Sequence, residues 1–72
     1  MEAKINKAHS ELLDNADLAR VRLLEAQRKA VRMAHTSAGV PHAHHLLEDR
    51  LHWEWENACE ALREFEEAHG IM

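Results

Sequence analysis

The chain has 72 residues, a net charge of −4 at neutral pH, two glycines, one proline and one cysteine. A chain this short makes a single domain and buries only about 60% of its unfolded surface, so a core of its own is marginal. The lone cysteine, Cys59, excludes an internal disulfide and fits a reducing compartment. No apolar run approaches the ~20 residues that span a bilayer, and the polar start is unlike a secretory signal. We therefore expect a soluble, cytoplasmic protein.

The first part of the chain predicts one long helix, from about Glu2 to Ser37. Apolar or small residues, with His9 as the one exception, recur there in alternating steps of four and three, which is the seven-residue repeat of a coiled coil. This repeat comprises Ile5, His9, Leu12, Ala16, Ala19, Leu23, Ala26, Ala30 and Met33. Its central members are mostly alanine, so a partner helix can approach closely. One alternative is a break at residues 14–17, where Asp14 or Asn15 can cap a new helix.

Gly39 and Pro41 predict a turn at residues 38–41, because glycine closes helices in the left-handed conformation and proline fits a first helical turn. A second helix is predicted from about His42 to His69. Its repeat is Leu47, Leu51, Trp55, Ala58, Leu62, Phe65, His69 and Met72. So short a turn makes antiparallel neighbours. The predicted fold class is all-α: one antiparallel two-helix hairpin, coiled-coil-like, that occupies the whole chain.

Two helices cannot bury both repeats together with the leucines and valines that lie outside them. The simplest way to bury these residues is a two-fold homodimer that forms a four-helix bundle. The predicted oligomer interface consists of Leu12, Ala16, Ala19, Leu23, Leu24, Ala26, Ala30 and Val31. A different partner chain is the alternative.

Five residues of metal-ligand type follow one another in steps of four and three along the second helix. They are His45, Asp49, His52, Glu56 and Cys59. Neighbours four apart chelate zinc or nickel weakly on any helix, whereas a structural zinc site needs four converging ligands, usually with cysteines in close pairs. This face is expected nearly opposite the apolar repeat. We therefore favour a solvated face and predict no cofactor.

Histidines also occur inside the predicted repeats and at the predicted turn. Glu66-x-x-His69 resembles the Glu-x-x-His element of di-iron bundles, but the first helix offers no glutamate on its repeat. We favour a polar layer of His9 and His69 that fixes the register. Four further histidines crowd the hairpin tip: His35, His42, His44 and His45. They are consistent with pH-dependent association, although exposed loop histidines explain them more simply.

The second half of the chain carries the negative charge. Residues 1–36 hold seven Lys/Arg and five Asp/Glu, a net +2, whereas residues 37–72 hold two and eight, a net −6. This balance disfavours nucleic acid and anionic membranes and suits a protein partner with a basic surface. Trp53 is expected to face outward, as interface anchors often do. The predicted partner-binding residues are Leu46, Trp53, Glu56, Glu60, Glu64 and Glu67.

No catalytic pattern is present, so we do not expect an enzyme. The chain has no glycine-rich phosphate loop, no nucleophile elbow and no tyrosine, and a hairpin lacks a concave pocket. We predict a regulator, adaptor or inhibitor that acts by protein–protein interaction. Small acidic inhibitors of nucleic-acid enzymes from phages and mobile elements act in this way, which is an analogy of size and charge alone. The alternatives are a metal-binding helical bundle with His, Glu and Asp ligands and a structural assembly subunit.

Overall fold

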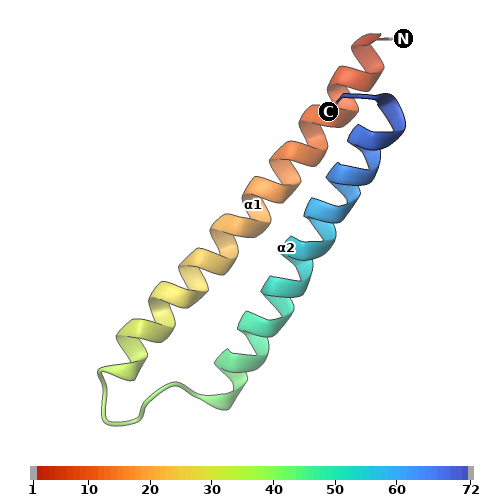
Figure 1. Ribbon diagram of the computed structural model, residues 1–72. Coiled ribbons are helices and arrows are strands. Elements are labelled where there is room, and N and C mark those ends of the chain that lie inside the picture. Colours follow the sequence, from red (N-terminus) through yellow and green to blue (C-terminus); the bar gives the residue numbers. More distant parts are fainter. Residues whose placement is uncertain (1, 72) are drawn as a thin grey trace.

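The computed structural model of the chain describes residues 2–71. Two helices, α1 (Glu2–Ala34) and α2 (His42–His69), run antiparallel and pack against each other (Figure 1). Together they form a rod of 56 × 16 × 15 Å. No strand occurs within residues 2–71, and the predicted all-α hairpin of two helices is confirmed.

α1 is one continuous helix of 33 residues. It contains neither glycine nor proline and is rich in alanine, leucine, arginine and glutamate, which have high helix propensities. Asp14 and Asn15 are exposed on its surface, where their side chains leave the helical backbone undisturbed. The alternative of a break at residues 14–17 is therefore not realised.

α1 ends at Ala34 rather than at the predicted Ser37. Thr36 accounts for the earlier end. Its backbone N–H bonds to the carbonyl of Met33 at 3.0 Å, and its hydroxyl donates to the same oxygen at 2.7 Å. An uninterrupted helix would instead use that carbonyl for the N–H of Ser37. The connection to α2 is longer than predicted as a result.

The turn and the start of α2 follow from Gly39 and Pro41, as the sequence predicts. Gly39 has φ +68°, the left-handed region that favours glycine, and its N–H bonds to the carbonyl of Thr36 at 3.1 Å. Pro41 is the N-cap of α2 in an extended conformation (φ −62°, ψ 147°). Its carbonyl accepts the first helical hydrogen bond, from His44 N–H at 3.0 Å. α2 then begins at His42.

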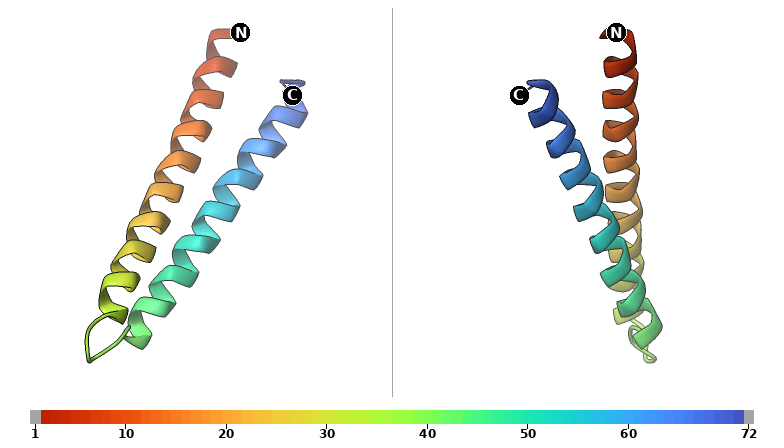
Figure 2. Two further views of the ribbon diagram at one scale, coloured as in Figure 1. Left: turned by 60° about the vertical axis from the view of Figure 1, so that its left-hand side comes forward. Right: turned by 90° about the vertical axis from the view of Figure 1, so that its right-hand side faces the viewer.

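The seam between the helices pairs small residues of α1 with large residues of α2. All nine members of the predicted α1 repeat are buried or half-buried there, and Ala16, Leu23 and Ala26 are the most buried apolar residues. On α2 the half-buried members of the predicted repeat are Leu51, Trp55, Ala58, Leu62 and Phe65. Alanine lets the axes approach, while the bulky side chains fill the gaps. Figure 2 shows the axes inclined to each other.

The α2 side of the seam differs from the prediction at both ends. Near the turn, His44 is buried and Glu48 is half-buried, whereas the predicted Leu47 is 45% exposed. The seam residue before Leu51 can lie four residues earlier, at Leu47, or three residues earlier, at Glu48. In the structure it is Glu48. At the other end His69 is exposed, and Met72 lies outside the described residues.

The expected layer of His9 against His69 is wrong. His9 Nε2 lies 2.9 Å from Glu66 Oε2, and its ring stacks on Phe65 with centroids 6.0 Å apart. His69 instead contacts Phe65 on its own helix. The pairing is shifted by about one helical turn because α1 ends earlier than predicted, which moves the centre of the connection toward α1.

Candidate protein-interaction surfaces

Leu46 and Trp53 lie on the side of α2 that faces away from α1. They are 56% and 65% exposed. Residues seven apart on a helix deviate by only about 20°, so Glu60 and Glu67 continue the same line, with Glu64 beside it. All three glutamates are exposed. We call these five residues the outer α2 face, which is apolar toward the turn and acidic toward the other end.

The electrostatic character of the outer α2 face follows from the composition of α2. This helix holds eight Asp/Glu and only two Lys/Arg. One of the two bases, Arg50, pairs with Glu54 at 3.4 Å. Within residues 2–71 the three glutamates of the outer α2 face form no salt bridge, so their charges are not neutralised by a neighbouring base.

Glu56, the remaining predicted partner-binding residue, is exposed one turn before Glu60. Its carboxylate lies 3.1 Å from Nδ1 of His52, one turn earlier. His52 also meets the ring of Trp55 edge-on, with centroids 5.8 Å apart. Glu56 therefore lies at the border between the outer α2 face and the flank that carries His52.

The five candidate metal ligands each follow a seam residue directly in the sequence, so they lie about 100° around α2 from the seam. This places the row His45, Asp49, His52, Glu56 and Cys59 on a flank and not opposite α1. Cys59 is half-buried and the other four are exposed. Of the five, only His52 and Glu56 come into contact.

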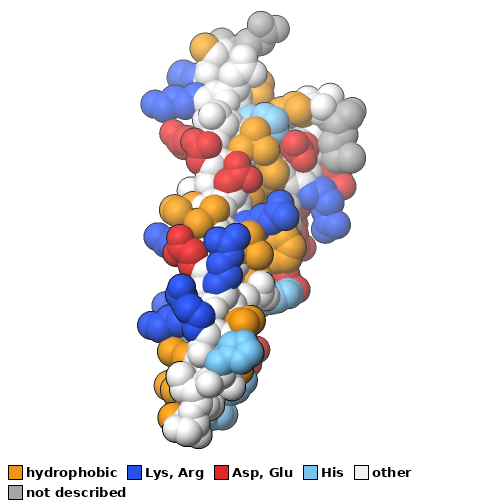
Figure 3. All heavy atoms as spheres, turned by 90° about the vertical axis from the view of Figure 1, so that its left-hand side faces the viewer, with side chains coloured by type: hydrophobic (Ala, Val, Ile, Leu, Met, Phe, Trp, Pro, Cys, Tyr) orange, Lys and Arg blue, Asp and Glu red, His pale blue; other side chains and the backbone are white. Residues whose placement is uncertain are grey.

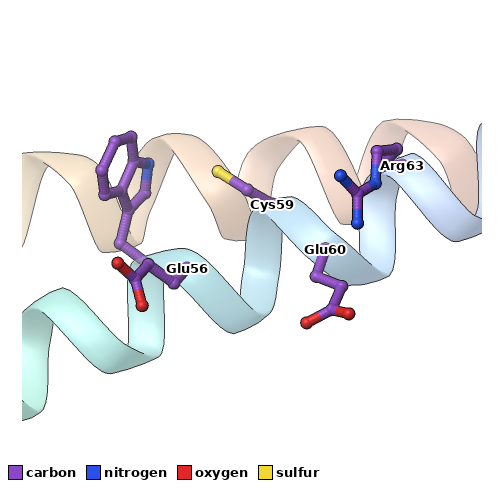
Figure 4. Close-up of a pocket in the computed structure, with 5 residues that line it drawn as sticks. Glu56, Cys59, Glu60 and Arg63 are labelled. Carbon is purple, nitrogen blue, oxygen red and sulfur yellow. The ribbon is translucent and has the colours of Figure 1, made fainter.

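A shallow hollow on this flank is lined by Trp55, Glu56, Cys59, Glu60 and Arg63, all from α2 (Figure 4). Figure 4 shows the Cys59 sulfur directed toward the α1 side and the Glu60 carboxylate directed away from it. Among residues 2–71, no three His, Cys, Asp or Glu side chains come together in a group that could hold a metal ion. The side chains of this flank diverge instead of converging.

The side of α1 that faces away from α2 carries exposed apolar residues. They are Leu13, Leu18, Val21, Leu24 and Val31. Figure 3 shows hydrophobic side chains interspersed with charged ones: Lys and Arg lie near the upper end and across the middle of the rod, and Asp and Glu lie between and among them. Of the eight predicted oligomer-interface residues, only Leu24 and Val31 are exposed here. The structure places the other six at the seam with α2: Leu12, Ala16, Ala19, Leu23, Ala26 and Ala30.

A groove runs between the helices near the turn. It is lined by Arg22, Glu25, Ala26, Lys29, Arg32, His44, Leu47 and Leu51. Three basic side chains of α1 form one rim, and the two leucines of α2 line the opposite side. The position of Leu47 at this groove accounts for its exposure.

Reasoning from sequence missed the structural role of His44. Its Nε2 lies 2.8 Å from the backbone carbonyl oxygen of Ala26, a buried hydrogen bond that joins the two helices. A carbonyl oxygen only accepts, so Nε2 must carry the hydrogen. The spacing of His44, Glu48 and Leu51 does continue the four-and-three repeat and would have placed His44 at the seam. His44 and Glu48 were not assigned to the repeat because they are polar.

No family model, no curated protein and no solved structure matches the chain. Within residues 2–71, neither helix combines the length and the apolar character needed to cross a bilayer.

Proposed function

We propose that the protein is a protein–protein interaction module, a regulator, adaptor or inhibitor, that docks its outer α2 face onto a basic surface of another protein. The observation that carries the proposal is the exposure of Trp53 beside Leu46 on a strongly acidic helix. Large apolar side chains are usually buried in a small protein, whereas these two lie on the side of α2 opposite the seam.

Trp53 supplies the energy of docking in this proposal. An indole that passes from water into a pocket of the partner buries a large apolar area, and removal of such an anchor costs about 2 kcal/mol or more. Leu46, one heptad earlier on the same line, widens the apolar contact. The two residues together fit a partner with an apolar recess.

In this proposal the glutamates of the outer α2 face determine which partner is bound and increase the rate of association. Glu60, Glu64 and Glu67 extend the docking line beyond Trp53 with exposed charges. Charges at the rim of an interface accelerate association with an oppositely charged partner and reject a partner of like charge. Phosphate backbones and anionic membranes are of like charge, so the partner is a protein. A groove that normally holds nucleic acid is one such basic surface.

We also propose that two hairpins associate into a four-helix bundle. The support is the set of exposed apolar residues on α1, which a monomer leaves in water. A two-fold dimer buries the same patch on both copies. The outer α2 face would remain available to the partner in a dimer that uses α1.

Affinity capture from the cells of origin tests the docking, with mass spectrometry of the untreated complex. We expect the wild type to retain a basic protein in a salt-sensitive manner. Trp53→Ala/Leu46→Ala and Glu60→Gln/Glu64→Gln should each lose it. The matched control Glu11→Gln/Glu25→Gln removes two acids from α1 and should keep it.

Titration of the purified partner then measures the contribution of the anchor. We expect Trp53→Ala to raise the dissociation constant by about 30-fold, which corresponds to the loss of about 2 kcal/mol. Equal retention of the partner by the wild type and by both outer-face variants would refute the proposal.

A further inference from the structure

The exposed side of α1 carries a charge pattern that is complementary to itself. Asp14, Asp17, Val21, Leu24, Arg28 and Val31 follow one another in steps of three and four, so they form a second stripe on the helix, nearly opposite the seam. All six are exposed; Val21 is 48% and Leu24 is 40% exposed. We call this stripe the outer α1 face. Its order along the chain is acidic (Asp14, Asp17), apolar (Val21, Leu24), basic (Arg28) and again apolar (Val31).

We infer that two copies of the chain dimerise through their outer α1 faces in antiparallel orientation, with the two-fold axis between Val21 and Leu24. Val21 of each copy then packs against Leu24 of the other. One layer further out, Asp17 of each copy meets Arg28 of the other. This inference deepens the self-association proposed above and rests on it, whereas docking through the outer α2 face is independent of it.

The stripe also fits the layer geometry of antiparallel coiled coils. Along each helix the stripe positions are separated alternately by three and by four residues. In an antiparallel pair, the first residue of a three-residue spacing on one helix faces the second residue of such a spacing on the other helix. Val21 begins and Leu24 ends such a step, and the same holds for Arg28 opposite Asp17. One register therefore satisfies the apolar contact and both ion pairs, without any adjustment of the helix.

The charges exclude the parallel orientation. Parallel pairing of the same faces sets Asp17 against Asp17 and Arg28 against Arg28, so each layer beside the apolar centre repels. They also favour a second copy over an unrelated partner. The same short segment supplies both the acids and the bases that complete its own interface, as a two-fold dimer requires.

The arrangement makes the two α1 helices the central pair. Each α2 remains on the far side of its own α1, so the four-helix bundle is flattened, with the two α1 helices at its centre. Leu46 and Trp53 stay exposed on the two outer edges of that bundle. A dimer of this kind presents two copies of the outer α2 face, which point away from each other.

A charge-reversal cycle tests the ion pairs by sedimentation at several concentrations. Asp17→Arg and Arg28→Asp each place like charges opposite each other, so each should raise the dimer dissociation constant by about tenfold or more. The double variant restores opposite charges and should return within about threefold of the wild type. Asp49→Arg makes the same charge change on α2 and should leave the constant within about twofold. A double variant that dimerises no better than either single variant would overturn the inference.

A distance measurement tests the orientation. Asn6→Cys in a Cys59→Ser background carries one spin label near the start of α1. In the antiparallel dimer the two labels lie about 50 Å apart, because each faces the turn of the other copy at a rise of 1.5 Å per residue. A distance under about 20 Å, which indicates parallel helices, would overturn the inference. So would a labelled chain that stays monomeric at about 0.5 mM. A monomer that still binds the basic partner through Trp53 would leave the docking proposal intact.

Discussion

His44 joins the two helices through a buried hydrogen bond to the Ala26 carbonyl. A polar side chain in a seam this small must be satisfied, because an unpaired buried donor costs about 1–3 kcal/mol. Its neighbour His45 projects into solvent and approaches only Glu48, at 4.0 Å. Two adjacent histidines therefore have different roles, which their residue type alone does not reveal.

We expect His44→Ala to lower the free energy of unfolding by about 1–2 kcal/mol, because it removes the bond and the packing of the ring. Chemical denaturation followed by circular dichroism measures the change. The control is His45→Ala, which should stay within about 0.5 kcal/mol of the wild type. Equal losses for the two variants would contradict the structural role of His44.

At the scale of the helices, the alanines of α1 set the distance across the seam. Ala16 and Ala26 are buried against α2, and Ala26 also borders the groove near the turn. Phe65, Leu62 and Trp55 on α2 supply the volume instead. The two helices of the hairpin thus differ: the small side chains of α1 allow a short distance between the axes, and the large side chains of α2 fill the space between them.

We expect Ala16→Leu to destabilise the hairpin by about 1–3 kcal/mol, since it forces the helices apart at a buried position of the seam. Thermal and urea unfolding measure the loss. Ala61→Leu makes the same substitution at an exposed position of α2 and should change stability by less than about 0.5 kcal/mol. A neutral Ala16→Leu would show that the seam is loosely packed.

The turn offers a test of backbone conformation alone. Gly39 has φ +68°, and a Cβ placed there would have no atom within 4 Å, so any cost of a side chain arises from the backbone. We expect Gly39→Ala to cost about 1 kcal/mol in unfolding free energy. D-alanine at the same position, introduced by chemical synthesis, favours positive φ and should be neutral or stabilising. An L-alanine variant as stable as the D-alanine variant would contradict this account.

Most of the architecture could be predicted from the sequence, and the reason is periodicity. The α1 repeat from Ile5 to Met33 lies at the seam throughout, because only one stripe of the helix has small and apolar residues in steps of four and three. The step before Leu51 could not be chosen, because residue type favours the apolar Leu47 whereas strict alternation of the steps favours Glu48. The register could not be predicted either, since it depends on Thr36, whose hydroxyl ends α1 before the expected boundary.

The candidate site was predictable only in part. Trp53 next to the core residue Trp55 had to face outward on a helix, and the structure places it there. Glu56 continues the acidic row one turn before Glu60, but its contact with His52 was not predicted. A pairing between side chains on the same flank depends on rotamers, which residue spacing does not specify.

At the scale of the whole molecule, charge is distributed along the rod. Residues 2–17 hold four acids and two bases, whereas residues 18–34 hold five bases and one acid. α2 is acidic along its length. Residues 18–34 of α1 are thus a basic segment in an otherwise acidic molecule. The outer α1 face, from Asp14 to Val31, extends into this segment.

We expect salt to weaken the dimer. The Asp17–Arg28 pairs of the proposed interface lie at the surface, where added ions screen them. Sedimentation in about 50 mM and about 500 mM NaCl should show a dissociation constant at least about threefold higher at the higher concentration. Asp17→Asn/Arg28→Gln lacks these charges and should respond less. An association that strengthens with salt would mean that apolar contacts, and not these ion pairs, hold the two copies together.

The antiparallel course of the helices also determines how the hairpin responds to force. Residues 2 and 71 lie at the same end of the rod, opposite the turn (Figure 1). Tension applied between them peels the helices apart, so the His9–Glu66 contact opens first and the Ala26–His44 bond opens last. Because the contacts across the seam open one after another, the force needed to separate the helices is low. Tension between residue 2 and the turn would instead stretch α1 along its axis and leave the seam unloaded.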